Sequence, residues 1–370
     1  MRPHKKKIYE KDSMTAQERF EKVIALEQPD RVPLSLMFYY FAPLYAGTKM
    51  SDFITKPDVY MDVMHKLYED LGPWDIYYNM NPVSRLIYSY VMMVWNYLPG
   101  IELEENELPK EVDVEYMQPE DYDRIIESDP FFADTLFRMR MLPRFCKEAK
   151  GKGFIGLGSI LLKEAVRQIL FWRKDFKWWR HRGAVVQSGY QAEMPFDIFY
   201  HARNVTNFSM DLFKTPGKIS KAALKIAENL GNNAVLMARL NGVPRVQCYC
   251  TRSSNNFISP QQFEELSLPV VELVVNRVIE AGMTPILHCD GDWLRNLKSM
   301  QRLPAKKIII QFDGMTDIFR AKEEIGDRMC IFGDVPPAKL VMGSPAEVEE
   351  YCHRLIEEVG RGGGFILGGG

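Results

Sequence analysis

The sequence predicts an α/β protein, a (β/α)8 TIM-type barrel with an N-terminal extension and an insertion over one face. From about residue 218 to the end of the chain, segments typical of strands alternate with segments typical of helices. This alternation favours parallel strands joined by right-handed crossovers. At least seven strands are expected, and the sequence has no glycine-rich dinucleotide-binding turn. A closed barrel is therefore favoured over an open, doubly wound sheet.

Composition narrows the functional class. The 370 residues are 46% hydrophobic and 26% charged, as in ordinary globular proteins. We expect a disordered lead over 1–14 and one barrel domain over 15–370. The net charge of −2 favours neither nucleic acid nor a membrane surface as a partner. Six cysteines lack a disulfide pattern and no long apolar segment is present, so a cytoplasmic location is expected.

The elements before residue 218 are expected as follows. A capping box, Thr15-Ala-Gln-Glu18, predicts the start of the first helix. Less regular residues, about 80–150, predict the insertion, for which a hairpin is one possible form. The remaining expected elements are a strand over Arg31–Phe41, a helix over 57–71, strands over Trp74–Asn79 and Gly153–Ile160, and a basic, aromatic helix over 171–182.

The second half is more regular. Serine followed by proline, at Ser259 and again at Ser344, predicts two helix starts. The chain stops at a strand without its covering helix, so we expect the natural product to be longer than 370 residues. Strands are expected over Arg245–Cys250, Thr284–Asp290, Lys307–Asp313, Met329–Asp334 and Phe365–Leu367, and further helices over 220–240, from about Trp293, and over Asp317–Ile325.

The segment TPILHCDGD, residues 284–292, carries the clearest chemical signal. Alternation along the strand places His288 and Asp290 on one face and Cys289 on the other. An imidazole and a carboxylate on one face make half of a zinc site, and Cys250 on the neighbouring strand could be a third ligand. A core histidine followed by a helix-capping aspartate is the structural alternative.

Other strand ends should converge on the same mouth, because active sites of such barrels lie at the carboxyl ends of the strands. We expect Asp313 and Asp334 to be acid or base groups, with helix capping as the alternative, and Tyr249 and Arg252 to bind substrate. A further polar cluster follows PFDIF, residues 195–199. For its members a structural ion-pair network is favoured over a place at the mouth: His201, Arg203, Asn204 and Asp211.

Six segments, in this order, resemble the uroporphyrinogen decarboxylase superfamily over nearly the whole chain: TAQERFEKVIALEQPDRVP, PFDIF with MDLFKTPGKI, SPQQFEELSLP, TPILHCDGD, IFGDVPPAKLVMGSPAEVEEY and GGGFIL. The resemblance implies a (β/α)8 barrel. True decarboxylases of this superfamily carry arginines just after the first strand, where this chain reads SLMFYYFAPLYAG. The corrinoid-dependent methyltransferase branch instead holds zinc through His-x-Cys and a later cysteine after the last strand.

His288 matches that zinc motif, whereas Asp290 stands in place of the cysteine, and the later cysteine would fall beyond Gly370. The resemblance therefore implies a zinc-dependent methyltransferase that passes a methyl group, for example from a methoxylated aromatic compound, to the cobalamin of a partner corrinoid protein. Two alternatives remain open. One is a metal-free decarboxylase of a carboxylated substrate that uses Asp313 or Asp334, and the other is a catalytically silent binding barrel.

Overall fold

Eight strand positions close a parallel barrel in the computed structural model, which describes residues 7–79, 96–113, 115–129 and 153–369. Every neighbouring pair in the main sheet is parallel, in the order β5-β2-β1-β11-β10-β9-β8-β7-β6. β5 and β6 follow each other in one extended segment, so their pairing with β2 and β7 closes the ring. The predicted barrel is confirmed. Its strands are β1 (Leu34–Leu36), β2 (Ile76–Tyr77), β5 (Val185–Val186), β6 (Tyr190–Glu193), β7 (Arg245–Tyr249), β8 (Thr284–Cys289), β9 (Ile309–Phe312), β10 (Cys330–Val335) and β11 (Phe365–Gly369).

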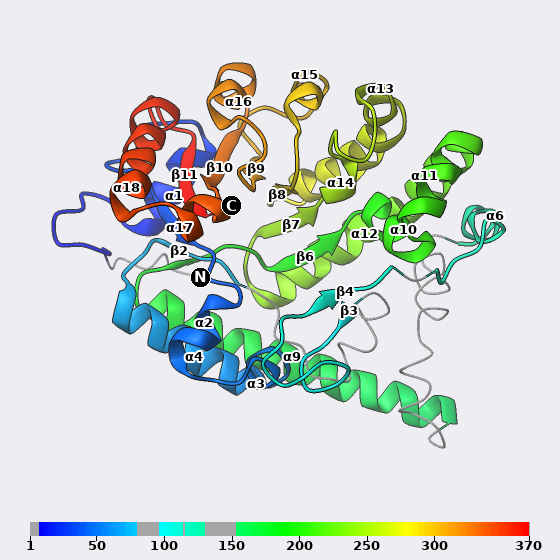
Figure 1. Ribbon diagram of the computed structural model, residues 1–370, viewed down its shortest axis with the longest axis horizontal. Helices are drawn as coiled ribbons and strands as arrows, with labels where there is room; N and C mark the ends of the chain where they lie inside the picture. The colour runs from blue at the N-terminus through cyan, green and yellow to red at the C-terminus, as the bar shows by residue number, and fades with distance from the viewer. Residues whose placement is uncertain (1–6, 80–95, 114, 130–152, 370) are drawn as a thin grey trace.

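Helices surround this barrel (Figure 1). The longest two, α9 and α12, pack against the strands with α4 and α14 beside them. A short antiparallel pair, β3 (Asn96–Tyr97) and β4 (Lys110–Glu111), lies in the expected insertion. The helices are α1 (Ala16–Ile24), α2 (Phe41–Ala46), α3 (Met50–Thr55), α4 (Pro57–Leu71), α6 (Asp121–Glu127), α9 (Gly153–His181), α10 (Pro195–Arg203), α11 (Val205–Lys214), α12 (Pro216–Asn241), α13 (Pro260–Gln262), α14 (Leu268–Glu280), α15 (Leu297–Met300), α16 (Ile318–Ile325), α17 (Pro337–Met342) and α18 (Pro345–Arg354).

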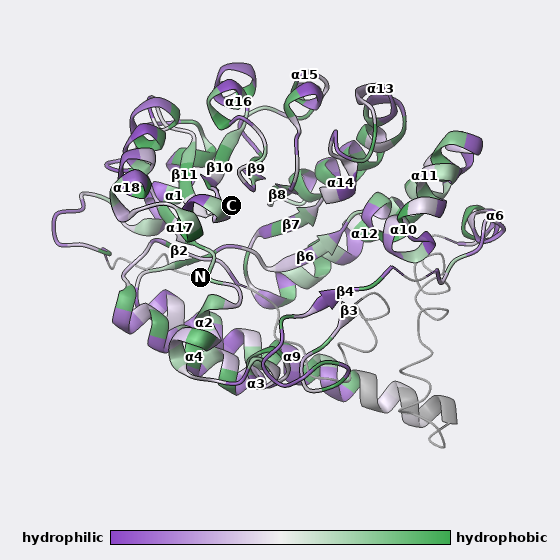
Figure 2. Ribbon diagram, viewed as in Figure 1, coloured by the Kyte–Doolittle hydropathy of each residue, from purple (hydrophilic) through white to green (hydrophobic). Residues whose placement is uncertain are grey.

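Alternation along the strands separates two apolar layers. Along each strand, every second side chain faces the helices, and Val246, Cys248 and Leu287 belong to this outer layer. The side chains between them face the barrel interior, where Ile286, Ile309 and others form an inner core. In Figure 2 most strands are correspondingly hydrophobic, while the surrounding helices alternate between hydrophilic and hydrophobic positions. Among the described residues, no helix combines the length and the apolar character needed to cross a membrane.

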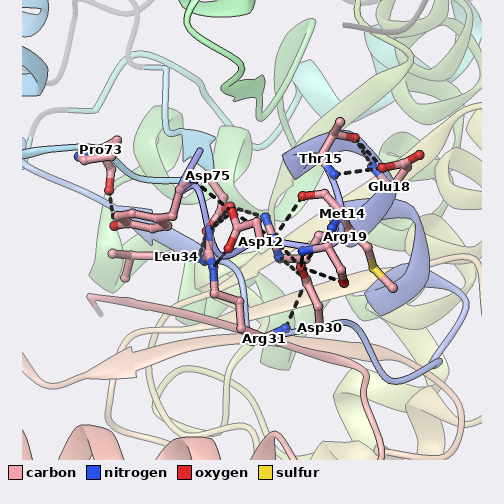
Figure 3. Close-up of polar contacts among 12 residues, drawn as sticks. Asp12, Met14, Thr15, Glu18, Arg19, Asp30, Arg31, Leu34, Pro73 and Asp75 are labelled. Carbon is pink, nitrogen blue, oxygen red and sulfur yellow. Dashed lines mark hydrogen bonds and ion pairs between the residues drawn. The ribbon is translucent and has the colours of Figure 1, made fainter. Parts of the chain in front are cut away.

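Helix α1 closes the barrel at the amino ends of the strands. Its Phe20 packs into the inner core. Its Arg19 is fully buried and pairs with Asp12, Asp30 and Asp75 at 3.1, 2.8 and 2.7 Å (Figure 3). Arg31 joins the same carboxylates, at 2.8 Å from Asp12 and 2.6 Å from Asp75. Asp12, in the segment expected to be a disordered lead, is thus buried in an ion-pair network.

Most local signals led to the right elements. The capping boxes at Thr15, Ser259 and Ser344 are all formed. The helix expected over 57–71 is α4 with these bounds, and the first strand is shorter than expected because α2 begins at Phe41. Tyr88, Tyr90, Trp95 and Cys146, from the expected insertion and its surroundings, lie outside the described residues.

Two assignments before residue 218 were wrong. The expected strand over Gly153–Ile160 is the first part of α9, which continues to His181. A short apolar run does not distinguish a strand from part of a helix, and here the helical continuation decided. The strand segment formed by β5 and β6 was not expected, because its sequence AVVQSGYQAE mixes apolar residues with glycine and polar residues.

Candidate active site at the barrel mouth

His288 and Asp290 meet at the carboxyl end of β8. The imidazole Nε2 lies 2.9 Å from the Asp290 carboxylate, as their placement on one face of the strand predicted. His288 is 5% exposed, whereas the Asp290 side chain is 37% exposed and therefore reaches solvent. Gly291 follows with a φ of +89°, a conformation that favours glycine, and turns the chain away from the strand. The pair is thus half open, with the histidine inside the barrel.

The contact between His288 and Asp290 favours the protonated, positively charged form of the histidine. Burial alone would lower the pKa of His288, but the hydrogen bond and the charge of Asp290 outweigh it and raise this pKa above its ordinary value. Burial would raise the pKa of Asp290, and the contact with His288 lowers it instead. The two shifts agree on an imidazolium paired with a carboxylate. Within the described structure, the His288 Nδ1 atom is buried and has no hydrogen-bond partner.

Three tyrosines line this pair. The Tyr249 ring meets the His288 ring edge-on with centroids 5.0 Å apart, and the Tyr39 and Tyr78 rings lie 6.2 Å from each other. Burial, with the Asp290 charge adding to it, raises the pKa of Tyr78 and Tyr249, so both hydroxyls keep their protons. Tyr39 has a φ of +30°, which is unusual for a bulky residue and typical of functional sites.

A layer of polar side chains lies beneath the tyrosines, inside the barrel. Ser35 donates to Gln187 at 3.3 Å, Gln187 donates to Gln247 at 3.1 Å, and Gln247 donates to the Tyr78 hydroxyl at 2.8 Å. Gln311 on β9 is aligned with His288 across the β8–β9 pair. Its buried carboxamide interacts with two side chains of the site, because a hydrogen bond with it helps to raise the pKa of His288 and another opposes the rise in the pKa of Tyr78.

The Cys250 side chain does not face the His288 ring, contrary to expectation, although its backbone amide donates to the His288 carbonyl at 2.9 Å. The pleat of β7 turns Tyr249 toward His288 and sends Cys250, with Cys248, into the outer apolar layer. Its Sγ contacts the Cys248 carbonyl at 3.6 Å, and burial raises the pKa of its thiol well above the ordinary value. The Cys250 side chain therefore points away from the His288–Asp290 pair.

The residues present do not complete a zinc site. Catalytic zinc takes three protein ligands, and among the described residues no three His, Cys, Asp or Glu side chains gather to hold a metal. His288 and Asp290 are ligand-type groups, with Nδ1 unpaired, but they already bind each other. They would hold zinc only if a third ligand came from outside the described residues.

Asp313 and Asp334 have different surroundings. Asp313 accepts hydrogen bonds from the backbone amides of Gly291 and Met315, both at 3.0 Å, and so joins the loops after β8 and β9. The cap of α16 is Asp317 rather than Asp313. Asp334 accepts from the Tyr351 hydroxyl at 3.1 Å, and burial raises its pKa to about 7. Asp334 is thus a carboxyl group that can hold a proton near neutral pH.

Arg252 lies on the rim of the mouth. Its guanidinium stacks on the Tyr200 ring at 4.0 Å and reaches Glu111 at 3.1 Å. Its backbone amide donates to the buried Asp197 at 3.1 Å. Burial, with Glu193 adding to it, raises the pKa of Asp197 well above the ordinary value. Arg252 also lies close enough to Asp290 for its charge to help lower the pKa of that carboxyl group.

The cluster that follows PFDIF divides into two parts. Arg203 and Asp211 are bonded at 2.6 Å and joined by Tyr122 and Glu115, which makes the expected structural network. His201 instead lies 3.3 Å from both Glu111 and Glu193 near the rim. Asn204 caps α11.

Sequence reasoning missed Tyr39, Tyr78, Gln187, Gln247 and Gln311. Gln311 and Gln247 could have been predicted from the sequence, because each is a polar residue in an otherwise apolar buried strand. Gln187 was hidden by the unrecognised β5–β6 segment. Tyr39 and Tyr78 lie just beyond short strands, where alternation gives no guide.

Comparison with known proteins identifies a related family. The family model described as uroporphyrinogen decarboxylase (URO-D) matches residues 186–370, half of the chain. Uroporphyrinogen decarboxylases from Trichodesmium erythraeum (strain IMS101) and Hordeum vulgare are 27% and 24% identical over 44% of this chain. The aligned parts are 45% and 48% of those proteins, so the chain spans less than half the length of these curated relatives.

The solved structure of a methyltransferase from Methanosarcina mazei superposes on nearly the whole chain. The TM-score is 0.67, with 97% of this chain and 93% of that chain covered. At 15% identity, this likeness supports the fold alone. The fold and the match over residues 186–370, which include β8 and its His288–Asp290 pair, lead to one assignment. The chain belongs to the uroporphyrinogen decarboxylase family.

Proposed function

We propose that this protein is a methyltransferase that moves a methyl group from a small methyl ether, such as a methoxylated aromatic compound, to the corrinoid of a partner protein. The observation that carries the proposal is the 2.9 Å contact between His288 Nε2 and the Asp290 carboxylate inside a tyrosine-lined mouth. An ether oxygen is a poor leaving group unless a proton or a Lewis acid neutralises the charge that develops on it. In the proposed reaction His288 supplies that proton.

The chemistry balances with the residues present. The bound corrinoid would supply a Co(I) nucleophile, whose electron pair forms the new bond to the methyl carbon. The pair of the broken C–O bond stays on the donor oxygen. His288 gives its Nδ1 proton to that oxygen, because Nε2 is engaged with Asp290. Asp290 keeps the ring oriented and charged, and Tyr249 packs against it. The aromatic walls suit an aromatic donor.

Exposed apolar residues at the rim of the barrel mouth support the proposal that a partner protein binds there. Several loops and short helices that follow barrel strands expose apolar residues to solvent. At least half of each of these residues is exposed: Phe41 and Leu44 on α2, Met315 after β9, and Leu340, Val341 and Met342 on α17. Apolar residues exposed together typically mark protein interaction sites. A partner that covers this rim would also exclude water from the reaction.

Porphyrin decarboxylation is disfavoured by the same region. Residues 34–47, from β1 through α2, contain tyrosines and phenylalanines but no arginine or lysine to bind the carboxylates of a tetrapyrrole. The proposal is tested by incubating the protein with 2-methoxyphenol and free cob(I)alamin and following loss of the Co(I) absorbance. His288→Ala should stop transfer. His353→Ala is a matched control, since His353 is 67% exposed on α18. Equal rates in wild type and His288→Ala would refute the proposal.

A metal-free decarboxylase is the second candidate. It is favoured by Asp334, whose pKa of about 7 allows it to donate a proton to a carbanion at neutral pH, and by the family match. Loss of CO₂ from a carboxylated substrate, abolished by Asp334→Asn and unaffected by His288→Ala, would favour this candidate over methyl transfer.

A further inference from the structure

A groove on the side of the barrel combines positive charge with exposed apolar surface. It lies between the start of α4 and the middle of α9 and encloses a cavity of about 550 Å³. Lys56, Arg167 and Lys174 line it, and Asp58 is the single carboxylate among the described residues of its wall. Leu170, which is 59% exposed, belongs to the same wall. We call this surface the α4–α9 groove.

The cations of the α4–α9 groove are held only loosely by their own chain. Lys174 lies 3.6 Å from Asp58, and Arg167 lies 3.6 Å from Glu164. Both cationic side chains are more than half exposed, and exposed ion pairs contribute little stability. These cations are therefore available to a surface that offers negative charge around an apolar side chain.

The same chain carries a surface of that complementary kind. Residues 101–108, IELEENEL, contain four glutamates and no lysine or arginine. Glu104 and Glu107 are exposed, and Leu108 beside them is 56% exposed. This segment, which we call the acidic loop, thus offers negative charge around a leucine, whereas the α4–α9 groove offers positive charge around a leucine.

The acidic loop and the α4–α9 groove lie at opposite ends of one short helix, α3. At its amino end, the Ser51 amide donates to the Glu105 carbonyl at 2.9 Å, and Lys49 pairs with the Glu105 carboxylate at 2.5 Å. At its carboxyl end, Thr55 and Lys56 line the groove. Because α3 has six residues, its two ends are about 9 Å apart. Figure 1 shows α3, α4 and α9 together on one side of the barrel.

We infer that a second copy of this chain docks here, so that the acidic loop of each copy enters the α4–α9 groove of the other. Two neighbouring patches of opposite charge are self-complementary under a two-fold axis, because each patch meets its opposite in the other copy. An axis that passes beside α3 brings both pairs of patches together, and Leu108 of one copy then packs near Leu170 of the other. The inference is independent of the proposed function, since none of these residues belongs to the His288–Asp290 site.

Sedimentation equilibrium of the full chain measures this association. Wild type should form a dimer whose Kd rises at least about 10-fold between about 0.01 M and about 1 M salt, because the Debye length falls from about 30 Å to about 3 Å. A dimer held by apolar contacts alone would not weaken in this way.

Two variants reverse the charge of one patch each. The groove variant carries Arg167→Glu and Lys174→Glu, and the loop variant carries Glu104→Lys and Glu107→Lys. Each variant alone should raise the dimer Kd at least about 10-fold, because like charges then meet in both halves of the symmetric interface. An equimolar mixture of the two should associate about as tightly as wild type, because opposite charges again face each other in both halves.

A control variant separates the position of the charges from their number. Lys221→Glu with Lys298→Glu changes exposed lysines of α12 and α15, outside the groove, and alters the net charge as much as the groove variant does. This control should dimerise like wild type. The melting temperatures of all three variants should stay near that of wild type, because every changed side chain is exposed.

Three results would overturn the inference. They are a chain that stays monomeric at every concentration, a dimer that both single-patch variants form as tightly as wild type, and a mixture of the two variants that does not associate. A monomer that instead binds a labelled synthetic helix of leucine and glutamate, with binding lost in the groove variant, would also overturn the second copy as the occupant and would assign the groove to an acidic segment of another protein.

Discussion

The two ends of the barrel both bury charged side chains, but they differ in how completely those charges are paired. At the amino ends of the strands, Arg19 is enclosed by three carboxylates, and Arg31 closes the network. Each buried polar side-chain atom of these residues has a partner within the described structure. At the carboxyl ends, the His288–Asp290 pair leaves the Nδ1 atom of His288 without a partner among the described residues, and the Asp290 side chain is 37% exposed.

The difference is what we expect if the carboxyl end carries the proposed reaction and the amino end is structural. In a complete network no polar atom is left to bind a ligand. Removing one charged member leaves its partners buried without an opposite charge, which destabilises the fold. An incomplete one keeps a donor or acceptor available at a cost in stability that a substrate can recover. The amino end should therefore respond to mutation in its stability, and the carboxyl end in its activity.

The largest effect is expected at the mouth. His288→Ala removes the proton donor, and methyl transfer from 2-methoxyphenol should fall about 10²- to 10⁴-fold, the range typical of general acids. The free energy of unfolding, measured in urea, should change little, because the variant also removes a buried charge. A variant that unfolds at much lower urea concentration would instead show that His288 is part of the scaffold.

Arg19→Met should give the reverse result at the other end. The substitution leaves Asp12 and Asp75 buried without one of their cationic partners, and breaking a buried pair costs about 3–5 kcal/mol. Urea unfolding measures this loss, and kcat of the remaining folded protein should stay near that of wild type. Arg354→Met is the matched control. Arg354 is half exposed and pairs with Glu358 at 3.0 Å, so its loss should leave urea unfolding nearly unchanged.

The two ends also differ in how much of their structure could be predicted from the sequence. The barrel, its capped helices and the His288–Asp290 pair follow from local patterns: alternation along β8, capping boxes and the convergence of strand ends. Each of these patterns is recognised from residues that are close together in the sequence. The features that they predict are therefore present in the folded structure.

What the sequence did not reveal depends on partners far apart in the chain. Arg19 meets Asp75 across 56 residues, and Gln247 meets Tyr78 across 169. No spacing rule brings such pairs together. Cys250 failed as a predicted ligand for a simpler reason, since the alternation that placed His288 inside the barrel also places Cys250 outside it.

The response to pH should have opposite signs at the two ends. Hydrogen bonds from Arg19 overcome the effect of burial and lower the pKa of Asp30 to about 2, so its contribution to stability is present above pH ~4 and is lost as pH falls toward 2. The pKa of His288 is raised, so its protonated form, and with it activity, is lost as pH rises through that pKa.

Asp290→Asn sharpens this contrast. Without the carboxylate, burial dominates and lowers the pKa of His288, so the alkaline limb of the kcat/KM profile should move to lower pH. The loss of stability at low pH should occur over the same pH range as in wild type, because Asp290 is not part of the Arg19 network. An unchanged alkaline limb would contradict the assignment of His288 as the proton donor.

The smallest effect is expected from removal of metal. With Cys250 turned outward and His288 bound to Asp290, the described residues offer two ligands, and we expect well below one zinc per chain by elemental analysis. Dialysis against a chelator should leave transfer rates unchanged. About one zinc per chain, lost in His288→Ala, would mean that a ligand outside the described residues completes the site. The metal would then take the place of the Nδ1 proton at the donor oxygen, and the mouth would become as fully paired as the amino end.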